Sequence, residues 1–116
     1  MTDKILVSTT CGSEEEAKRL AQLLVEERLA ACVQILPQVF SVYRWRGAVE
    51  EGCECLLLVK SRRDLFGELC RRLRAAHSYE LPEIAVLPVV DGDLDYLSWI
   101  DAGLRSPESL QDTPAV

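Results

Sequence analysis

Three residues of metal-binding type are spread along this chain, and together they could form one site. Cys11 follows an apolar segment, His77 is the only histidine, and Glu83 begins the last apolar segment. A thiol near the start of a helix has a lowered pKa, so we expect Cys11 to be thiolate more often than an ordinary cysteine. Thiolate and imidazole suit copper or zinc, and a carboxylate completes either ligand set. The residue types therefore predict a candidate metal site made of Cys11, His77 and Glu83.

Each of these residues also has an ordinary structural role, and such roles are the more common ones. Cys11 is compatible with an inert thiol, His77 with a side chain that complements the last turn of a helix, and Glu83 with an ion pair to an arginine. A nucleophilic pair of Cys11 and His77 is a further alternative. The sequence offers no orienting residue and no oxyanion donor for such a pair.

The remaining cysteines favour the core over a second metal site. Cys53 and Cys55 form a C-x-C pair, a spacing that binds soft metals, but we expect both on the core face of a strand. Cys32 and Cys70 fall on apolar faces and are expected in the core. The chain has no C-x-x-C, and its five cysteines cannot all pair within one chain. We therefore expect free thiols and a reducing, cytoplasmic compartment.

The composition excludes several classes of protein. The 116 residues suffice for one domain, and 48% hydrophobic and 28% charged residues are typical of globular proteins. A net charge of −6 argues against a nucleic-acid partner. The apolar runs are far shorter than the roughly 18 residues of a membrane span, and we expect no signal peptide and no membrane partner. No G-x-S-x-G, glycine-rich phosphate loop or H-E-x-x-H occurs, so we expect no enzyme.

The hydrophobic pattern predicts the elements that must position the candidate residues. We expect strands over 4–10, 32–46, 49–60 and 83–90, a helix from Ser13 to about Leu29, a second helix capped by Ser61, and a short last helix capped by Asp93. Pro37 predicts a bulge, bend or edge. The order βαββαβ plus a helix predicts an α+β, ferredoxin-like domain, with an antiparallel sheet and both main helices on one face. We expect this domain over 1–105 and a loose tail over 106–116.

This topology brings the candidate residues to one edge of the sheet. The end of the first strand (Cys11), the end of the second helix (His77) and the start of the last strand (Glu83) all lie there. The tip of the hairpin between the two long strands points to the same edge. Tyr79 lies in the connection after His77, where a tyrosine binds a ligand or, more commonly, packs and bonds the backbone. We therefore expect Cys11, His77 and Glu83 to converge.

The two hairpin strands look about twice as long as the usual ~5–6 residues. They should project past the helices and leave Tyr43 and Trp45 with little protein around them. The outermost strand would also be an unprotected edge. Because a partner subunit would cover both features, we expect a homo-oligomer built by strand-to-strand contact.

Five linked segments, in order over roughly residues 4–105, carry a family resemblance. They are Arg28-Leu29-Ala30-Ala31-Cys32-Val33, Tyr43-Arg44-Trp45-Arg46-Gly47, Glu54 to Lys60, His77-Ser78-Tyr79-Glu80-Leu81-Pro82-Glu83-Ile84 and Tyr96-Leu97-Ser98-Trp99. Together they resemble the CutA family of divalent-cation-tolerance proteins. The resemblance implies a homotrimer of PII-like architecture that binds copper or another divalent metal and acts in metal tolerance. It implies no established enzymatic activity.

The resemblance also implies site residues. In bacterial members the metal site is associated with a cysteine after the first strand and a histidine ending the second helix, which match Cys11 and His77. Glu83 is added only by the topology. Three positions depart from the family pattern, and the first removes one potential ligand. They are Ala76 in place of a second histidine, Ser78 in place of the usual proline, and Gln34 in place of a frequent asparagine.

A second class of function stays open. The chain could be a PII-like signalling or scaffold trimer whose intersubunit clefts bind a small molecule or a partner protein. Tyr43, Trp45 and Tyr79 are then the expected interface or cleft residues. Arg44 and Arg46 could hold an anion, although the chain has no basic phosphate-binding loop.

Overall fold

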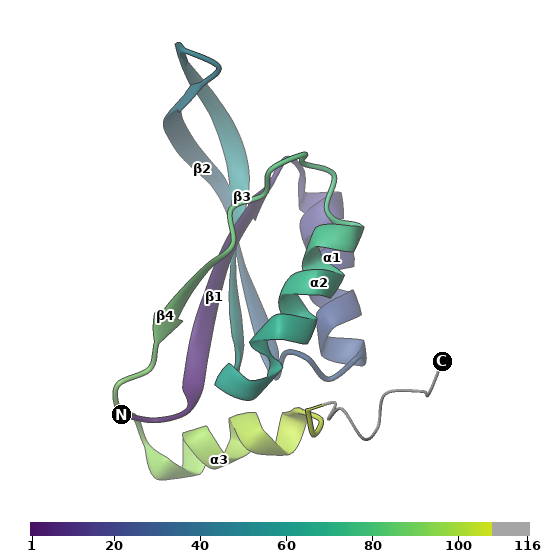
Figure 1. Cartoon of the computed structure of the whole chain (residues 1–116), viewed down its shortest axis with the longest axis vertical. Helices are drawn as coiled ribbons and strands as arrows, with labels where there is room; N and C mark the ends of the chain where they lie inside the picture. Colours follow the sequence, from purple (N-terminus) through teal and green to yellow (C-terminus); the bar gives the residue numbers. More distant parts are fainter. Residues whose placement is uncertain (108–116) are drawn as a thin grey trace.

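A computed structural model describes residues 1–107, which form a four-stranded sheet with three α-helices. The strands are β1 (Lys4–Cys11), β2 (Cys32–Trp45), β3 (Ala48–Arg62) and β4 (Ala85–Pro88), and the helices are α1 (Glu14–Glu26), α2 (Phe66–Ala76) and α3 (Leu94–Gly103). The strand order is β2-β3-β1-β4, every neighbouring pair is antiparallel, and α1 and α2 cover the same face (Figure 1). The predicted α+β class and ferredoxin-like order are therefore confirmed.

The expected tail over 106–116 lies mostly outside the described residues. Within the described part, no helix is long and apolar enough to cross a membrane.

The core lies between the sheet and the helix pair α1 and α2. Val7 pairs with Val59, and Val59 pairs with Val33, so these side chains share the covered face. Fully buried leucines fill the space above them, namely Leu20, Leu24, Leu57, Leu65, Leu69 and Leu73. Burial of one such side chain contributes about 1.5–3 kcal/mol, so this layer holds the helices on the sheet. The opposite face, which α1 and α2 leave uncovered, is called the open face below.

The two expected N-caps have different outcomes. Ser13 caps α1 as predicted, because its hydroxyl oxygen accepts the N–H of Glu16 at 3.1 Å. Ser61 does not cap α2. It still belongs to β3, which pairs with β1 as far as Arg62, and its hydroxyl donates to the carbonyl of Leu29 at 2.7 Å. A short 3-10 turn follows, and α2 begins without a side-chain cap.

Helix α1 ends earlier than predicted, at Glu26 instead of about Leu29. Arg28 adopts the left-handed backbone region, with φ of 59°. The N–H groups of Leu29 and Ala30 then turn back to the carbonyl of Leu24, at 3.0 and 3.1 Å. This closure is a common helix ending. The apolar pattern continues past the helix because Leu29 is itself fully buried.

The β2–β3 hairpin projects far beyond the rest of the sheet (Figure 1). Its strands have 14 and 15 residues. β1 ends at Cys11 opposite Cys55, so the segments Val39–Trp45 and Ala48–Glu54 pair only with each other. The predicted projection of the hairpin is therefore confirmed.

Two local features allow the hairpin its shape. The β2–β3 register shifts between Leu36 and Val39, which confirms the irregularity expected at Pro37. At the tip, Arg46 and Gly47 have φ of 50° and 83°. Two positive φ values are those of the tight turn whose twist matches paired strands.

Strand β4 is shorter than predicted, Ala85–Pro88 instead of 83–90. It pairs only with Ile5–Ser8 of β1. Backbone bonding to the start of the chain continues just past Pro88, where the N–H of Val89 donates to the carbonyl of Lys4 at 3.0 Å.

The predicted burial of three cysteines is wrong. Cys53 is exposed, because β3 at that point extends beyond the end of β1 and beyond the helices. Cys32 and Cys70 are half-buried rather than in the core, and Cys32 lies opposite Lys60 on the open face. Cys55 is buried as expected.

Helix α3 crosses the strand ends on the side away from the hairpin tip (Figure 1). The carboxylate of Asp93 accepts the N–H of Tyr96 at 3.0 Å, which confirms the predicted cap. Asp101 in this helix forms ion pairs with Lys4 and Arg62, each at 3.1 Å. These pairs tie the first strand, the third strand and the last helix together.

The buried hydroxyl of Ser61 gives a test of this arrangement. Ser61→Ala is expected to lower the free energy of unfolding by about 1–3 kcal/mol, because the Leu29 carbonyl loses its donor in the core. Ser98→Ala, at an exposed position of α3, should change it by less than about 0.5 kcal/mol. Denaturation in guanidinium chloride measures both. Equal effects of the two variants would contradict the assigned role of Ser61.

Candidate functional site

Two of the predicted metal residues lie at the end of the sheet from which the hairpin projects. Cys11 is the last residue of β1 and His77 is the C-cap of α2, and both are buried. Nε2 of His77 lies 2.7 Å from the carbonyl oxygen of Thr10, the residue before Cys11. The structure therefore places Cys11 and His77 at one place in the fold.

Both ring nitrogens of His77 already have hydrogen-bond partners. A carbonyl oxygen only accepts, so Nε2 carries the proton and donates to Thr10. Nδ1 accepts the N–H of Tyr79 at 3.0 Å. These two bonds fix one neutral tautomer of the ring. A metal ion bound to either nitrogen would displace one of them.

Cys11 is a thiol rather than the expected thiolate. Its side chain is fully buried, and its Sγ donates to the carbonyl of Ser13 at 3.5 Å. Burial raises the pKa of this thiol to about 11, and the charge of Glu16 acts in the same direction. The predicted lowering of its pKa is therefore wrong. The cost of desolvating a thiolate exceeds the benefit of the nearby helix start.

Glu83 lies on the open face, away from Cys11. Its Oε2 accepts the hydroxyl of Ser8 at 2.5 Å. Ser8 and Cys11 are three residues apart in a strand, so their side chains point to opposite faces. Across residues 1–107, no group of three or more His, Cys, Asp or Glu side chains is arranged to hold a metal ion. The expected convergence thus applies to Cys11 and His77 but not to Glu83.

A different carboxylate, that of Glu16, lies near the histidine. Its Oε2 is 3.8 Å from Nδ1 of His77. The two carboxylate oxygens accept the backbone N–H and the hydroxyl of Ser78, both at 2.8 Å. Burial alone would raise the pKa of Glu16, but the hydrogen bonds from the backbone and hydroxyl of Ser78, together with one from the backbone of Gly12, hold it below its usual value. The carboxylate is therefore charged at neutral pH.

Sequence reasoning missed Glu16 as a site residue because the capping-box pattern explained it completely. In that pattern the glutamate turns back to its own helix start. Here its side chain also reaches the segment after α2, some sixty residues further along. The one available signal was Ser78, a hydroxyl donor where the family usually has proline.

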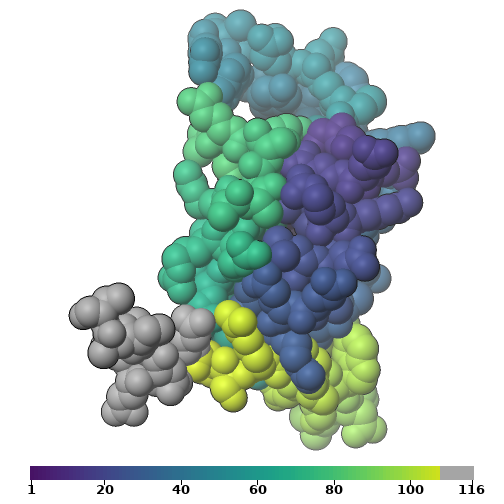
Figure 2. Space-filling model, turned by 90° about the vertical axis from the view of Figure 1, so that its right-hand side faces the viewer, coloured from purple at the N-terminus to yellow at the C-terminus, as the bar shows by residue number. Residues whose placement is uncertain are grey.

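A cavity of about 610 Å³ lies between the hairpin and the segment that follows α2. In Figure 2 the hairpin forms the top of the molecule and this segment, in green, lies below it. Aromatic and acidic side chains dominate its walls, which include Tyr43, Trp45, Tyr79, Glu54, Glu80 and Glu83. The three residues expected at an interface or cleft, Tyr43, Trp45 and Tyr79, therefore border the same space.

Tyr79 links the cavity to the buried pair. Its hydroxyl donates to Oε1 of Glu54 at 3.0 Å, and its N–H donates to His77. Burial, and then the carboxylate of Glu54, raise the pKa of Tyr79 well above its usual value. The phenol is therefore a permanent hydrogen-bond donor.

The two arginines considered for anion binding have partners of their own. Arg44 donates to the carbonyl of Gly47 at 3.4 Å. Arg46 forms an ion pair with Glu80 at 3.3 Å, and its guanidinium lies 5.3 Å from the ring centre of Trp45. The cavity beside them carries carboxylates, so the arrangement disfavours an anion.

The comparisons with known proteins all point to one family. The family model described as CutA1 divalent ion tolerance protein matches residues 5–103. A divalent-cation tolerance protein CutA from Thermus thermophilus is 50% identical over 95 residues, which cover 82% of this chain and 92% of the relative. Protein CutA from Homo sapiens is 43% identical over 107 residues, covering 92% of this chain and 58% of the relative. The chain spans 51–58% of the length of the human, mouse, rice and Arabidopsis relatives.

Solved structures agree with this result. The structure of a divalent cation tolerance protein, Cut A1, from Thermus thermophilus has a TM-score of 0.86 at 46% identity, covering 88% of this chain and 99% of its own. CutA from Xylella fastidiosa has a TM-score of 0.87 at 38% identity, covering 90% and 100%. Both fold and sequence are therefore shared over most of the chain.

The Glu16 contacts predict a pH-dependent stability. Glu16→Gln is expected to lower the free energy of unfolding at neutral pH by about 1.5–3 kcal/mol, because an amide cannot accept both bonds from Ser78 with a charge. The pKa of Glu16 is lower in the folded state than in the unfolded state. Its stabilisation is therefore present above the unfolded pKa and lost as pH falls through the folded one.

The difference between Glu16→Gln and the parent should therefore be full at neutral pH and shrink below about pH 4. Glu15→Gln, an exposed neighbour in the same helical turn, controls for the helix dipole. Denaturant unfolding at both pH values measures the effect. A pH-independent loss, or an equal loss for Glu15→Gln, would contradict this role.

Proposed function

The chain belongs to the CutA1 divalent ion tolerance family, and on this premise we propose that it is a homotrimer that binds divalent cations and acts in metal tolerance. Copper, as Cu²⁺, is the proposed metal, with zinc as the alternative. The protein acts by binding and not by catalysis. Its free thiols favour a cytoplasmic location. The observation that carries this proposal is the family match over residues 5–103.

The proposed metal residues are Cys11 and His77. A soft sulfur and an imidazole nitrogen suit copper and zinc, and the two residues share one end of the fold. As they stand they do not form a ready-made site, because the thiol is protonated and both ring nitrogens are hydrogen-bonded. Binding must therefore compete with a proton and with these bonds, so affinity should depend on pH.

The exposed apolar surface of the hairpin supports the homotrimer. Phe40, Val42 and Val49 are 62%, 61% and 63% exposed. They lie beyond β1 and the helices, so no element of the described fold covers them. Apolar surface of this kind marks contact between proteins, and the long edge strand β2 offers backbone groups for pairing. A PII-like arrangement of three such sheets would bury both.

A second candidate function is favoured by the cavity. A PII-like signalling or scaffold trimer would bind a small molecule or a partner protein in clefts near the hairpin. The space bordered by Tyr43, Trp45 and Tyr79 has the volume of a small-molecule site.

The assembly can be tested directly. Native mass spectrometry of the tag-free, reduced protein is expected to give three subunits. The double variant Phe40→Glu, Val42→Glu is expected to dissociate them, because it places charges in an apolar interface. Val25→Glu is the matched control, since Val25 is an exposed valine on α1, away from the hairpin. A monomeric parent protein would overturn the assembly.

The metal residues can be tested in the same instrument and by calorimetry with Cu²⁺ or Zn²⁺ under anaerobic conditions. One ion per subunit is expected, and Cys11→Ser and His77→Gln should each weaken binding at least about tenfold. Affinity should rise with pH by up to about tenfold per unit, because the thiol with its pKa of about 11 must lose a proton.

The exposed thiol of Cys53 supplies the control for that experiment. Cys53→Ser should leave the affinity unchanged. Loss of binding in Cys53→Ser alone would show that the metal sits on a surface thiol. Unchanged affinity in both Cys11→Ser and His77→Gln would exclude the proposed residues.

A further inference from the structure

The cavity beside the hairpin has dimensions that suit an organic molecule better than a bare ion. Its volume of about 610 Å³ falls within the roughly 300–1,000 Å³ of small-molecule sites. The carboxylates around it do not approach one another as ligands of one metal, since no such group occurs in residues 1–107. An occupant must therefore fill space as well as carry charge.

The walls combine aromatic faces from two separate parts of the chain. Tyr43 and Trp45 are two residues apart in β2 and share one face of the hairpin, while Tyr79 comes from the segment after α2. The faces of aromatic rings carry partial negative charge and attract cations within about 6 Å. Such rings are the usual walls of sites for ammonium and guanidinium groups.

The charge of the walls has one sign. Glu54, Glu80 and Glu83 border the cavity, and the lining that the described residues provide contains no Lys, Arg or His. The net charge of −6 adds to this field. The hydroxyl of Tyr79 bonds one oxygen of Glu54, and that of Ser8 bonds one oxygen of Glu83. These neutral donors position the carboxylates without neutralising them.

A guanidinium group already rests at the rim of this cavity. The side chain of Arg46, at the hairpin tip, lies 5.3 Å from the ring centre of Trp45 and 3.3 Å from Glu80. It is largely exposed, and an exposed ion pair contributes only about 0–1 kcal/mol, so another cation can displace it. The chain's own cation thus makes the two kinds of contact, aromatic and carboxylate, that the cavity offers.

We propose that this cavity binds a small organic cation with an ammonium or guanidinium head and an apolar body, one per subunit. The head lies among Glu80, Glu83 and Trp45 and competes with the Arg46 side chain. The body lies against Tyr43 and Tyr79. This inference names a ligand class for the second candidate function and rests on that candidate, but it does not depend on the proposed role in metal tolerance.

The test uses calorimetric titration of the full-length protein with butylguanidinium, and with butylurea as the neutral compound of the same shape. Butylguanidinium should bind with a stoichiometry of one per subunit, and butylurea should not. Glu80→Gln and Glu83→Gln should each weaken binding about fivefold, and Trp45→Leu by a similar factor. Arg46→Ala should tighten binding, because it removes the competing guanidinium.

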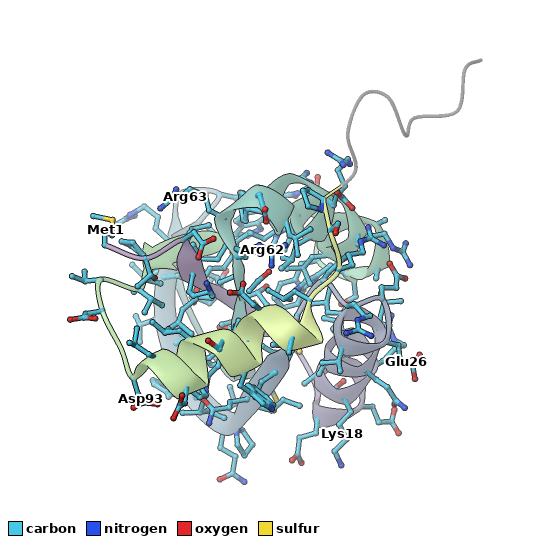
Figure 3. The ribbon with its side chains drawn as sticks, turned by 90° about the horizontal axis from the view of Figure 1, so that it is seen from below. Met1, Lys18, Glu26, Arg62, Arg63 and Asp93 are labelled. Atoms are coloured by element: carbon cyan, nitrogen blue, oxygen red, sulfur yellow. The ribbon has the colours of Figure 1, made fainter. Side chains whose placement is uncertain are left out.

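Glu26→Gln, an exposed glutamate on α1, is the matched control and should have no effect (Figure 3). Equal binding of butylurea, absence of saturable binding up to about 10 mM, or unchanged affinity in both cavity glutamate variants would overturn the proposal. Weaker binding in Arg46→Ala would also overturn it. Cu²⁺ affinity, measured on the same variants, should not change, so failure here is distinguishable from failure of the metal proposal.

Discussion

The unequal lengths of the strands determine which surfaces are exposed at the end of the molecule that carries the β2–β3 hairpin. β3 pairs with β2 along almost its whole length, but β1 pairs only with the part of β3 from Cys55 to Arg62. In the remaining hairpin the backbone groups between the two strands bond each other, whereas those on its outer edges have no neighbouring strand and its side chains have no second layer. The core therefore stops at the end of β1, and the cavity and the exposed apolar surface both begin there. The exposed apolar surface and the cavity therefore lie next to the buried polar residues.

Just inside that boundary, the buried polar side chains of His77 and Glu16 have hydrogen-bond partners. The ring of His77 joins the end of β1 to the connection after α2, and Glu16 joins the start of α1 to the same connection. Removing one partner leaves another buried group without a hydrogen bond. This lowers the free energy of unfolding by more than the loss of a contact at the surface does. The same constraint keeps Cys11 protonated. Any ligand that enters here must replace bonds as well as make them.

The sequence predicted the fold class, the caps Ser13 and Asp93, the irregular hairpin and the meeting of two site residues. These depend on periodicity and connectivity, which are local or topological properties. It failed where the result depends on which face or which neighbour a side chain meets. Glu83 is at the expected edge but on the other face, and Ser61 bonds a distant carbonyl instead of its own helix. The thiol of Cys11 titrates according to its burial, which spacing alone does not report.

The tight turn at the hairpin tip has a consequence for the order in which the chain folds. β2 and β3 are neighbours in sequence, and closing such a hairpin takes about 1–10 μs. β4 must instead find Ile5–Ser8 across about eighty residues, which carries a larger loop-closure entropy. The hairpin is therefore expected to form while both of its edges still lack neighbours. Chain concentration during synthesis then governs whether the first partner of this edge is a correct subunit or an aggregate.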